Sequence, residues 1–382
     1  MKVLITVTHL LGTGHLARAL VLAKEYKAAG HEVRVVSGGM PAAHLAQGDV
    51  DLLQLPPLRS DGVNFTTLLD ASSAPATPAL LDARRDIAVS AVRDMQPDVF
   101  ITELFPFGRR VLRAEFTAML EAAHALTPRP LICSSIRDIL APPSKPGKAE
   151  ATLALIDSYY DAVLVHSDPQ ITPLETSWPV ADNLQRKLFY TGYVCPAPAA
   201  DIRSPEHPPR VVVSAGGGDV GEPLNRIVLQ TAQQAPDLRW HLLVGGRDSA
   251  RKIAELQQQA PPHLEVEPLR SDFRKLLYSA GASVSLCGYN TALDILQAGT
   301  PAVFVPFDAG GEVEQSLRAE ALQKLDGIEV LKTAQLSATR LDAAVRRALR
   351  APARAPRRHN MDGAKASLDI LTRQAARLRR AG

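Results

Sequence analysis

The residues with the clearest capacity for chemistry lie at 286–315, where two glycine turns each precede a short predicted helix. The apolar run at 282–287 predicts a buried strand, and Gly288 lets the chain turn sharply after it. The run at 301–306 predicts the neighbouring strand, and the glycine pair at 310–311 opens the next helix. Two helix N-termini should therefore point at one edge of a parallel sheet. Their free N–H groups and partial positive charge suit a diphosphate.

Polar side chains follow both turns. We expect Asn290 or Thr291 to cap the first helix, which Gly299 ends. Asp294 and Gln315 lie within about one turn of the two N-termini, where they can hydrogen-bond hydroxyl groups attached to the diphosphate. A nucleotide-sugar is the ligand that this pattern favours. The donor-binding residues predicted here are Gly288, Asn290, Thr291, Asp294, Glu314 and Gln315.

Two further glycine turns follow predicted strands upstream. The turn Ser214-Ala-Gly-Gly-Gly-Asp219 ends the strand at 210–214, and three glycines before a helix let the backbone approach a phosphate closely. A plain flexible turn is the alternative interpretation. After the strand at 240–244, we expect Arg247 to help neutralise a diphosphate. These turns add Ser214, Gly216, Gly217, Gly218 and Arg247 to the predicted donor-binding residues.

The N-terminal glycine loop argues against a dinucleotide cofactor. Residues 11–17 fit G-x-G-x-x-A after the first strand. A dehydrogenase would also need an acidic residue at the end of the second strand, to hold the ribose, and residues 36–39 read Val-Ser-Gly-Gly instead. We therefore expect no NAD(P) or other cofactor. Gly12 and Gly14 are instead predicted to bring the backbone close to a ligand, on the side where a second substrate, the acceptor of the sugar, would bind.

His15 and Glu103 are the candidates for acid–base catalysis. His15 directly follows Gly-Thr-Gly at a helix N-terminus, which disfavours the imidazolium and keeps the ring able to accept a proton. Glu103 ends the strand at 98–103, and open α/β sheets bind ligands beyond the carboxyl ends of their strands. We interpret Glu103 as a general base, as the group that orients His15, or as an ion-pair partner of Arg109 or Arg110. A purely structural role is the alternative for His15.

Two arginines and one acidic motif are the other polar features that could take part in binding. Arg109 is placed on the acceptor side, and Arg137 follows the strand at 131–136, where it lines the acceptor site or forms a salt bridge with Asp138. Residues 49–51 spell D-x-D, which marks metal use in a different transferase fold. Because this motif leads into a strand away from the predicted nucleotide site, we interpret it as a surface feature.

The pattern G-Y-N-T-x-x-D-x-x-x-x-G-T-P-x-x-x-V-P, followed by E-Q-x-x-R-A, resembles the nucleotide-sugar site of MurG-like glycosyltransferases of family 28. The resemblance implies that Asp294, where the MurG enzymes have Glu, holds the ribose and that Gln315 holds the donor sugar. It implies a site-building histidine at His15. It also implies a metal-independent GT-B fold, in which two Rossmann-like parallel-sheet α/β domains face each other across a cleft. The segments 9–15, 102–110 and 134–140 look closest to a bacterial branch of predicted glycosyltransferases.

A chain of 382 residues is long enough for two domains. We predict an acceptor-side domain at 1–196, a proline-rich linker at 197–209, and a donor-binding domain at 210–360. The final helix, within 361–382, is expected to return to the first domain, as the GT-B resemblance implies. Residues 56–78 are predicted to form a long loop.

Strands alternate with helices throughout, which predicts parallel sheets. In the first domain, strands are predicted at 2–8, 32–37, 50–55, 98–103, 131–136, 162–166 and 189–194, and helices at 14–29, 79–95, 109–126 and 149–160. In the second, strands are predicted at 210–214, 240–244, 264–268, 282–287 and 301–306, and helices at 224–234 and 249–258 and from residue 272. The last helix is predicted at 363–379.

The composition is that of an ordinary globular protein, with 46% hydrophobic and 22% charged residues. No apolar run reaches the roughly 18–20 residues of a spanning helix, and the N-terminus enters a strand without a secretory signal. Three widely spaced cysteines favour neither disulfides nor a zinc site. We therefore expect a cytoplasmic protein.

Basic charge is concentrated at the end of the chain. Residues 341–382 hold 11 Lys and Arg against three Asp, a local net charge of +8, whereas the whole chain carries +3. The outer face of a solvated amphipathic helix is one interpretation. Peripheral contact with anionic lipid at the inner membrane face, at about 1 kcal/mol per basic group, is the other. Nucleic acid is not an expected partner, because the tail lacks interleaved aromatic residues for base stacking.

These features together predict an inverting glycosyltransferase of the hexosyltransferase type. It would move a sugar from a nucleotide diphosphate donor, with UDP favoured, to the hydroxyl group of an unidentified acceptor. Hydrolysis of the nucleotide-sugar by water on the same fold is one alternative. A non-catalytic nucleotide-sugar-binding protein is the other.

Overall fold

The computed structural model describes residues 1–43, 45, 47–60, 67–197, 209–351 and 360–381. The chain divides into two compact units. Met1–Cys195 and Asp362–Gly382 form the first, and Pro196–Met361 form the second. Most of the predicted linker at 197–209 lies outside the described residues.

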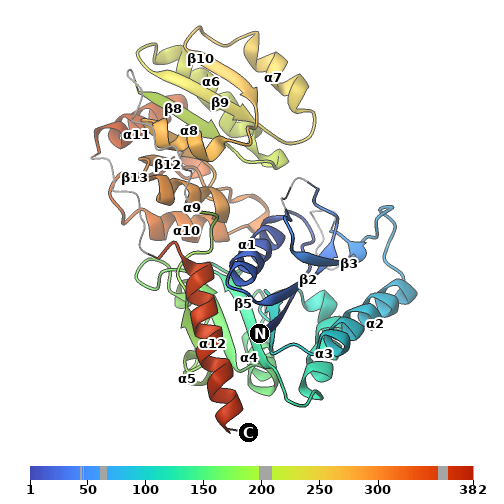
Figure 1. Ribbon diagram of the computed structural model, residues 1–382. Helices are drawn as coiled ribbons and strands as arrows, with labels where there is room; N and C mark the ends of the chain where they lie inside the picture. Colours follow the sequence, from blue (N-terminus) through green and yellow to red (C-terminus); the bar gives the residue numbers. More distant parts are fainter. Residues whose placement is uncertain (44, 46, 61–66, 198–208, 352–359, 382) are drawn as a thin grey trace. The chain divides into compact units, whose positions relative to one another are not determined.

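A seven-stranded parallel sheet forms the centre of the first unit, in the order β3-β2-β1-β4-β5-β6-β7 (Figure 1). Its strands are β1 (Lys2–Val7), β2 (Glu32–Gly39), β3 (Asp51–Leu58), β4 (Val99–Glu103), β5 (Leu131–Arg137), β6 (Ala162–His166) and β7 (Leu188–Tyr190). The inner strands are almost entirely buried, mainly apolar runs. Such runs are typical of strands that helices cover on both faces.

Helices pack on both faces of this sheet. They are α1 (Gly14–Ala28), α2 (Pro78–Met95), α3 (Arg113–His124), α4 (Lys148–Tyr159), α5 (Asp182–Gln185) and α12 (Gly363–Ala381). Successive side chains of a strand point to opposite faces. In β4, accordingly, Phe100 joins the apolar cluster with α2 and α3, whereas Ile101 joins the one with α1 and α12. The two core clusters therefore lie on opposite faces of β4, the strand that ends at the candidate catalytic residue Glu103.

The last helix, α12, packs against α1 within the first unit. Leu368 and Leu371 lie in the same core cluster as the buried face of α1. The Gly363 N–H donates to the carbonyl oxygen of Tyr193 at 3.0 Å. A Cβ atom at position 363 would lie 2.6 Å from the carbonyl oxygens of Gly192 and Tyr193, so a glycine is needed for the helix to begin this close to them.

Three sequence predictions for this unit are corrected by the structure. The helix predicted at 109–126 does not begin at Arg109, whose φ of 59° is left-handed; a 3₁₀ turn at Arg110–Leu112 follows, and α3 begins at Arg113. The strand predicted at 189–194 ends at Tyr190, and Gly192 turns the chain with a φ of 79°. Within the predicted loop at 56–78, β3 continues to Leu58, and antiparallel bridges join Leu69 to Arg59 and to Pro75.

A six-stranded parallel sheet forms the second unit, in the order β10-β9-β8-β11-β12-β13. The strands are β8 (Arg210–Ser214), β9 (Arg239–Val244), β10 (Leu264–Pro268), β11 (Ala282–Ser285), β12 (Ala302–Phe304) and β13 (Ile328–Val330). The helices are α6 (Glu222–Gln234), α7 (Ser249–Gln257), α8 (Phe273–Ser279), α9 (Tyr289–Ala298), α10 (Glu314–Leu322) and α11 (Ala338–Arg350). β11 and β12 are neighbours, so α9 and α10 both begin beyond the carboxyl ends of adjacent strands.

Candidate functional site

His15 and Glu103 meet beyond the carboxyl ends of β1 and β4, which are paired in the sheet. His15 is the second residue of α1, and Glu103 is the last residue of β4. His15 Nδ1 lies 2.9 Å from Glu103 Oε1. The histidine side chain is 13% exposed and the glutamate side chain 1%, so the pair is largely buried.

The hydrogen bonds assign the proton of His15 to Nδ1. This nitrogen faces the Glu103 carboxylate at 2.9 Å and the Arg18 guanidinium at 3.3 Å. An ionised carboxylate can only accept, so the shorter contact requires an N–H at Nδ1 and leaves the lone pair on Nε2. Burial lowers the pKa of His15 to about 3, and the nearby charge of Arg109 acts in the same direction. The ring is therefore neutral at physiological pH.

Arg18 is the ion-pair partner of Glu103, rather than Arg109 or Arg110 as the sequence suggested. Burial alone would raise the pKa of Glu103. The charge of Arg18 and the hydrogen bonds from His15 and Ser135 outweigh burial and hold this pKa well below its usual range. Arg18 was not among the predicted site residues, although it lies one helical turn after His15 on α1.

The turn after Glu103 determines where Arg109 and Arg110 lie. Leu104 and Arg109 both have left-handed backbones, with φ of 69° and 59°, which is uncommon for residues other than glycine. Arg109 Nε donates to the carbonyl oxygen of Thr8 at 2.5 Å. The Arg110 guanidinium instead lies over the ring of Trp178, 5.9 Å from its centroid.

The remaining predicted acceptor-side residues lie on the same side of this sheet edge or in the loop before α1. Arg137 ends β5 and is close enough to His15 for its charge to lower the pKa of that ring. Gly14 is the first residue of α1, and Gly12 is exposed. A Cβ atom at position 12 would meet no described atom within 4 Å.

In the second unit, the predicted donor-binding residues lie around the starts of α9 and α10. Gly288 is the N-cap residue of α9, so neither Asn290 nor Thr291 caps the helix; both lie inside its first turn. Glu312 precedes α10 rather than lying in it, and its carboxylate accepts the N–H of Glu314 at 2.7 Å. The predicted caps were wrong because the turn continues into the helix at Tyr289, before either polar residue.

Asp294 pairs with Arg274, which was not among the predicted site residues. Arg274 Nε, on α8, lies 3.1 Å from Asp294 Oδ1, and the two side chains are 26% and 16% exposed. Burial raises the pKa of Asp294 to about 6, although the charge of Arg274 opposes this shift. Arg274 also donates to the carbonyl oxygen of Pro196 at 3.1 Å and to the side chain of Gln297.

Gln315 is the second residue of α10 and is turned toward the strand that precedes it. Its Oε1 accepts the backbone N–H of Phe307 at 3.2 Å, which leaves the amide –NH₂ group to donate elsewhere. Asp294 and Gln315 thus follow two adjacent strands, as predicted, but each already interacts with a group of the protein.

The glycine turn after β8 has an open backbone. Ser214 Oγ accepts the Gly216 N–H at 3.2 Å, and Gly216 has a φ of 75°. A Cβ atom at Gly216 or Gly218 would meet no described atom within 4 Å, and one at Gly217 would only touch Leu269, at 3.8 Å. Arg247, in the turn after the neighbouring strand β9, is exposed.

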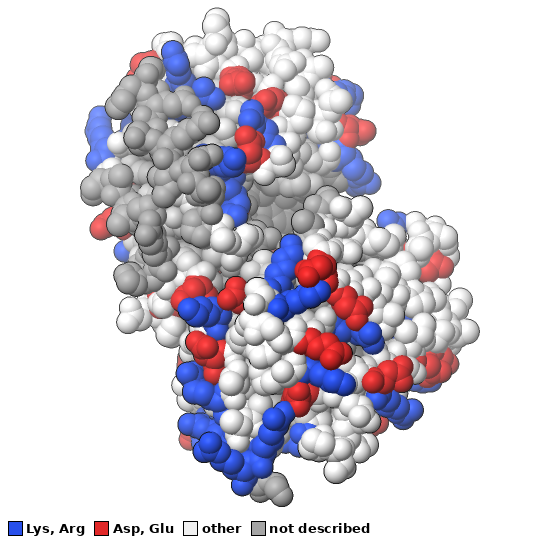
Figure 2. All heavy atoms as spheres, viewed as in Figure 1, with Lys and Arg blue, Asp and Glu red and all other residues white. Residues whose placement is uncertain are grey.

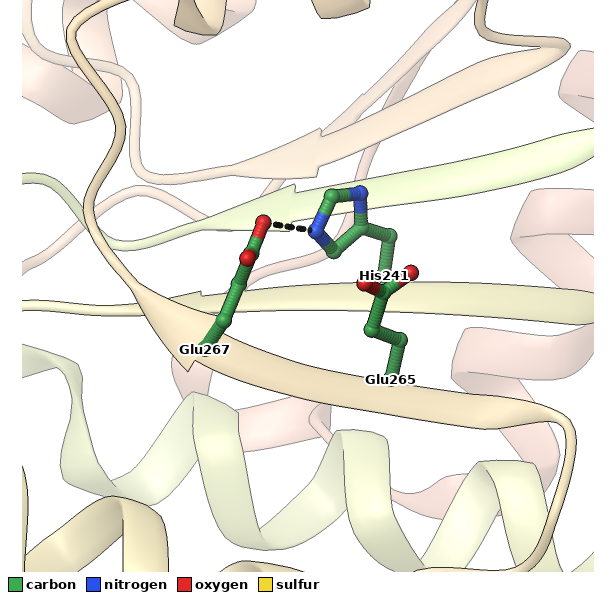
Figure 3. A group of neighbouring side chains, drawn as sticks. All are labelled: His241, Glu265 and Glu267. Carbon is green, nitrogen blue, oxygen red and sulfur yellow. Dashed lines mark hydrogen bonds and ion pairs between the residues drawn. The ribbon is translucent and has the colours of Figure 1, made fainter.

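A group of potential metal ligands lies elsewhere in the second unit (Figure 3). Within the described ranges, ligand atoms of His241, Glu265 and Glu267 lie within 4.8 Å of one another. His241 Nε2 lies 2.5 Å from the Glu267 carboxylate. Each carboxylate also forms an ion pair with an arginine: Arg270 lies 3.2 Å from Glu267, and Arg210 lies 3.5 Å from Glu265. Two arginines already neutralise these ligands, so we interpret the group as an ion-pair network.

The predicted basic surface is present at the end of the chain. Arg373, Arg377, Arg379 and Arg380 of α12 are exposed, and Arg379 pairs with Asp98. Figure 2 shows basic side chains gathered at the lower tip of the view, where α12 ends in Figure 1. Across the described part of the chain, every helix is too short or too polar to pass through a bilayer.

Comparison with known proteins places this geometry in context. Residues 211–373 match the glycosyltransferase family 28 C-terminal domain. An uncharacterized glycosyltransferase of Methanosarcina acetivorans is 24% identical over 321 residues, which cover 80% of this chain and 79% of the relative. A UDP-N-acetylglucosamine–N-acetylmuramyl-(pentapeptide) pyrophosphoryl-undecaprenol N-acetylglucosamine transferase of Gloeobacter violaceus is 28% identical over 164 residues, 42% of this chain and 44% of the relative.

The fold is also found among solved structures. MurG of Acinetobacter baumannii superposes with a TM-score of 0.64 at 15% sequence identity, covering 98% of this chain and 100% of that structure. A likeness at this identity concerns the fold, and it confirms the GT-B architecture of two parallel-sheet α/β units that the sequence predicted.

Proposed function

Because the chain is a MurG-like glycosyltransferase with a family 28 C-terminal domain, we propose that it transfers a hexosyl group from UDP-sugar to an acceptor hydroxyl with inversion at the anomeric carbon. We assign the base to His15 and Glu103, and the donor contacts to the glycine turns, Asp294 and Gln315. Arg109 and Arg137 are assigned to the acceptor side.

The observation that carries this proposal is the buried His15–Glu103 hydrogen bond of 2.9 Å. It leaves Nε2 of a neutral imidazole as the acceptor of a proton. In the proposed step, Nε2 takes the proton of the acceptor hydroxyl as its oxygen forms a bond to the anomeric carbon. The bond from that carbon to the diphosphate oxygen breaks, and the diphosphate leaves with the electron pair. Glu103 stabilises the imidazolium that forms.

The donor assignment rests on the surroundings of β11 and β12. Two helix N-termini and an open glycine turn suit the diphosphate, Asp294 can accept hydrogen bonds from ribose hydroxyls, and Gln315 can donate to the sugar. The Gloeobacter relative is described as using UDP-N-acetylglucosamine, which supports UDP as the nucleotide. Ribose binding to Asp294 would have to share or displace the Arg274 contact.

We further propose that the reaction needs neither metal nor cofactor. The positive potential that a leaving diphosphate requires can come from the N-termini of α9 and α10 and from Arg247. Turnover that is unchanged by a chelator at millimolar concentration is the expected result. Turnover that a chelator abolishes and added Mg²⁺ restores would contradict it.

The exposed basic residues of α12 support peripheral contact with anionic lipid as part of this function. Co-sedimentation with vesicles containing anionic lipid, lost when Arg373 and Arg377 are both changed to Ser, is expected. Equal sedimentation with neutral vesicles would contradict the electrostatic origin of the contact.

The decisive experiment offers UDP-sugars with and without mixtures of hydroxyl acceptors and follows the sugar by mass spectrometry. Sugar attached to an acceptor supports transfer, with release of UDP depending on that acceptor. UDP release at the same rate without any acceptor would instead indicate hydrolysis. Tight binding of donors without any product would indicate a binding protein.

A further inference from the structure

A row of buried polar side chains lies behind Glu103, on the side away from His15. Ser135 Oγ lies 2.6 Å from Glu103 Oε2, and His166 Nε2 lies 2.9 Å from the same Ser135 oxygen. His166 Nδ1 in turn lies 2.8 Å from Thr191 Oγ1. Ser135 and His166 are fully buried, and Thr191 is 4% exposed. We call this row, from Glu103 through Ser135 and His166 to Thr191, the strand-end chain.

Sheet register explains why these residues line up. Ser135 in β5 is the register partner of Glu103 in β4, so both side chains point to the same face. Leu164 in β6 is the register partner of Ser135, and His166, two residues later, returns to that face. Thr191 directly follows the end of β7. The strand-end chain therefore crosses the carboxyl ends of four adjacent strands.

The ionised carboxylate sets the direction of the hydrogen bonds from Ser135 and His166. Glu103 can only accept, so the single hydroxyl proton of Ser135 must point to it. The Ser135 oxygen then accepts from His166, which requires the proton of that ring to be on Nε2. The Thr191 hydroxyl has one proton and faces three acceptors: His166 Nδ1 at 2.8 Å, the carbonyl oxygen of Gly192 at 2.7 Å and that of Val165 at 3.4 Å. With its proton on Nε2, the neutral His166 ring can only accept at Nδ1.

The surrounding charges keep this arrangement in one protonation state. Burial lowers the pKa of His166 to about 3, and the charge of Arg18 acts in the same direction. Arg18 on α1, Arg109 after β4 and Arg137 at the end of β5 favour an ionised Glu103, a neutral His15, or both. Glu103 is the anionic side chain in this arginine-rich region, and both of its carboxylate oxygens accept hydrogen bonds.

We propose that Ser135 and His166 are positioning residues that hold one oxygen of Glu103, so that its other oxygen keeps the proton of His15 on Nδ1 and leaves Nε2 free to act as the base. This inference rests on the proposed role of His15. Without Ser135, Arg18 and His15 would both bind Oε1 and the carboxylate could rotate. His15 would then exchange between its two tautomers, and only one of them accepts the acceptor's proton.

The test measures the tautomer of His15 directly in the full-length protein. The two ring nitrogens of a histidine have different ¹⁵N chemical shifts according to which one bears the proton, and ten histidines can be resolved by selective labelling. The spectrum of His15→Gln identifies the His15 signals. We expect a pure Nδ1–H form in the unchanged protein and a measurable Nε2–H fraction in Ser135→Ala and in His166→Leu.

Two matched controls separate positioning from a general effect on the core. Ser134, on the same strand, is equally buried and donates to the carbonyl oxygen of Phe105 at 2.8 Å, outside the strand-end chain. Ser134→Ala should therefore leave the tautomer and kcat unchanged. His166→Gln keeps an N–H donor toward Ser135 and should rescue much of what His166→Leu loses. If Ser135→Ala does not fold, Thr191→Val probes the same row from its outer end.

The kinetic expectation is a kcat about tenfold lower in Ser135→Ala, the size of losing a hydrogen bond to a charged group, with the KM for the donor unchanged. A His15 that keeps its Nδ1–H form and its full kcat in both Ser135→Ala and His166→Leu would overturn the inference. A wild-type rate in His15→Ala would instead overturn the proposed base, and the tautomer spectra would still decide whether the strand-end chain holds the ring.

Discussion

The candidate catalytic pair and the candidate donor region differ in how deeply their side chains are buried and in how many hydrogen-bond partners within the protein they already have. Glu103 is 1% exposed, and hydrogen bonds from His15, Arg18 and Ser135 hold its carboxylate. Asp294 is 16% exposed and pairs with Arg274, whose side chain is 26% exposed. Around the donor region the turns are glycine, and a Cβ added at Gly288 would meet no described atom within 4 Å.

This difference fits the roles proposed for the two regions. A base needs a fixed tautomer and a fixed pKa before the substrate arrives, and burial with preformed partners supplies both. A diphosphate site has to admit a charged ligand. Its backbone therefore stays accessible, and its side chains have to be able to exchange a protein partner for the ligand. The first region is expected to tolerate almost no change, and the second to respond in graded steps.

The largest effect is expected from removing the base. His15→Ala should lower kcat about 10²–10⁴-fold, because no other group would take the acceptor's proton. The affinity for the donor should change little. Steady-state kinetics with saturating donor would measure this. His124→Ala is the control, since that ring contacts Tyr159, through the carbonyl oxygen at 3.1 Å and edge-on through the side chain, and lies outside the candidate site. Equal rates for the two variants would remove the distinction between the regions.

A smaller loss is expected when Asp294 is changed. Asp294→Ala should weaken UDP-sugar binding by about 10–100-fold, the usual size for losing hydrogen bonds to a charged group, and should spare kcat at saturating donor. Calorimetric titration would measure it. Glu320→Ala is the matched control, because it removes an acid of the same unit that pairs with exposed Lys332 at 3.0 Å. Unchanged affinity in Asp294→Ala would count against the ribose assignment.

Open space at a glycine provides a finer test of the donor region. Gly288 has a φ of −66°, so Ala is compatible with its backbone, and its Cβ would meet no described atom within 4 Å. Gly288→Ala should keep the melting temperature yet weaken donor binding about tenfold, because the methyl group would crowd the diphosphate. Gly12→Ala fills similarly open space in the other unit. The same loss of donor affinity in both variants would argue against a local contact at Gly288.

Much of the fold, including the two strands, turns and helices of the candidate donor region, could be predicted from sequence, because strand, glycine turn and helix are local signals. Asp294 and Gln315 follow neighbouring strands for that reason. The capping prediction failed at Asn290, because a glycine N-cap gives no side-chain signal. The helix predicted from Arg109 failed because nothing in the residue type indicates a left-handed backbone.

The partners of the key carboxylates could not be predicted, because they depend on tertiary packing. Ser135 lies 32 residues from Glu103 and meets it only through the register of β4 and β5. Arg274 reaches Asp294 from a different helix. Arg18 was within reach of sequence reasoning, since it lies three residues after His15 on one helix face. The chemistry of single residues is thus local, whereas their protonation depends on contacts across the sheet.

The smallest expected effect separates the two regions by pH. Burial raises the pKa of Asp294 to about 6, so less of its carboxylate is ionised at pH 5.5 than at pH 7, and donor affinity should fall about fourfold over that interval. A UDP-sugar is the suitable ligand, because its diphosphate diester does not titrate there. Asp294→Asn should abolish the dependence. A fourfold change that persists in this variant would assign the titration to another group.

His15, by contrast, should not titrate over the same interval. Burial lowers the pKa of His15 to about 3, so the ring stays neutral at both pH values, and titration of His15 should not change kcat at saturating donor.

The same pKa values predict how folding stability depends on pH. The unfolded chain binds a proton at His15 below about pH 6.5, so the contribution of this residue to folding stability is present above that pH and is lost as the pH falls toward 3. For Asp294 the sign is reversed: its burial costs stability as the pH rises from about 4 through 6, because the unfolded chain ionises first. A kcat that falls together with donor affinity between pH 7 and pH 5.5 would show that the two regions titrate as one.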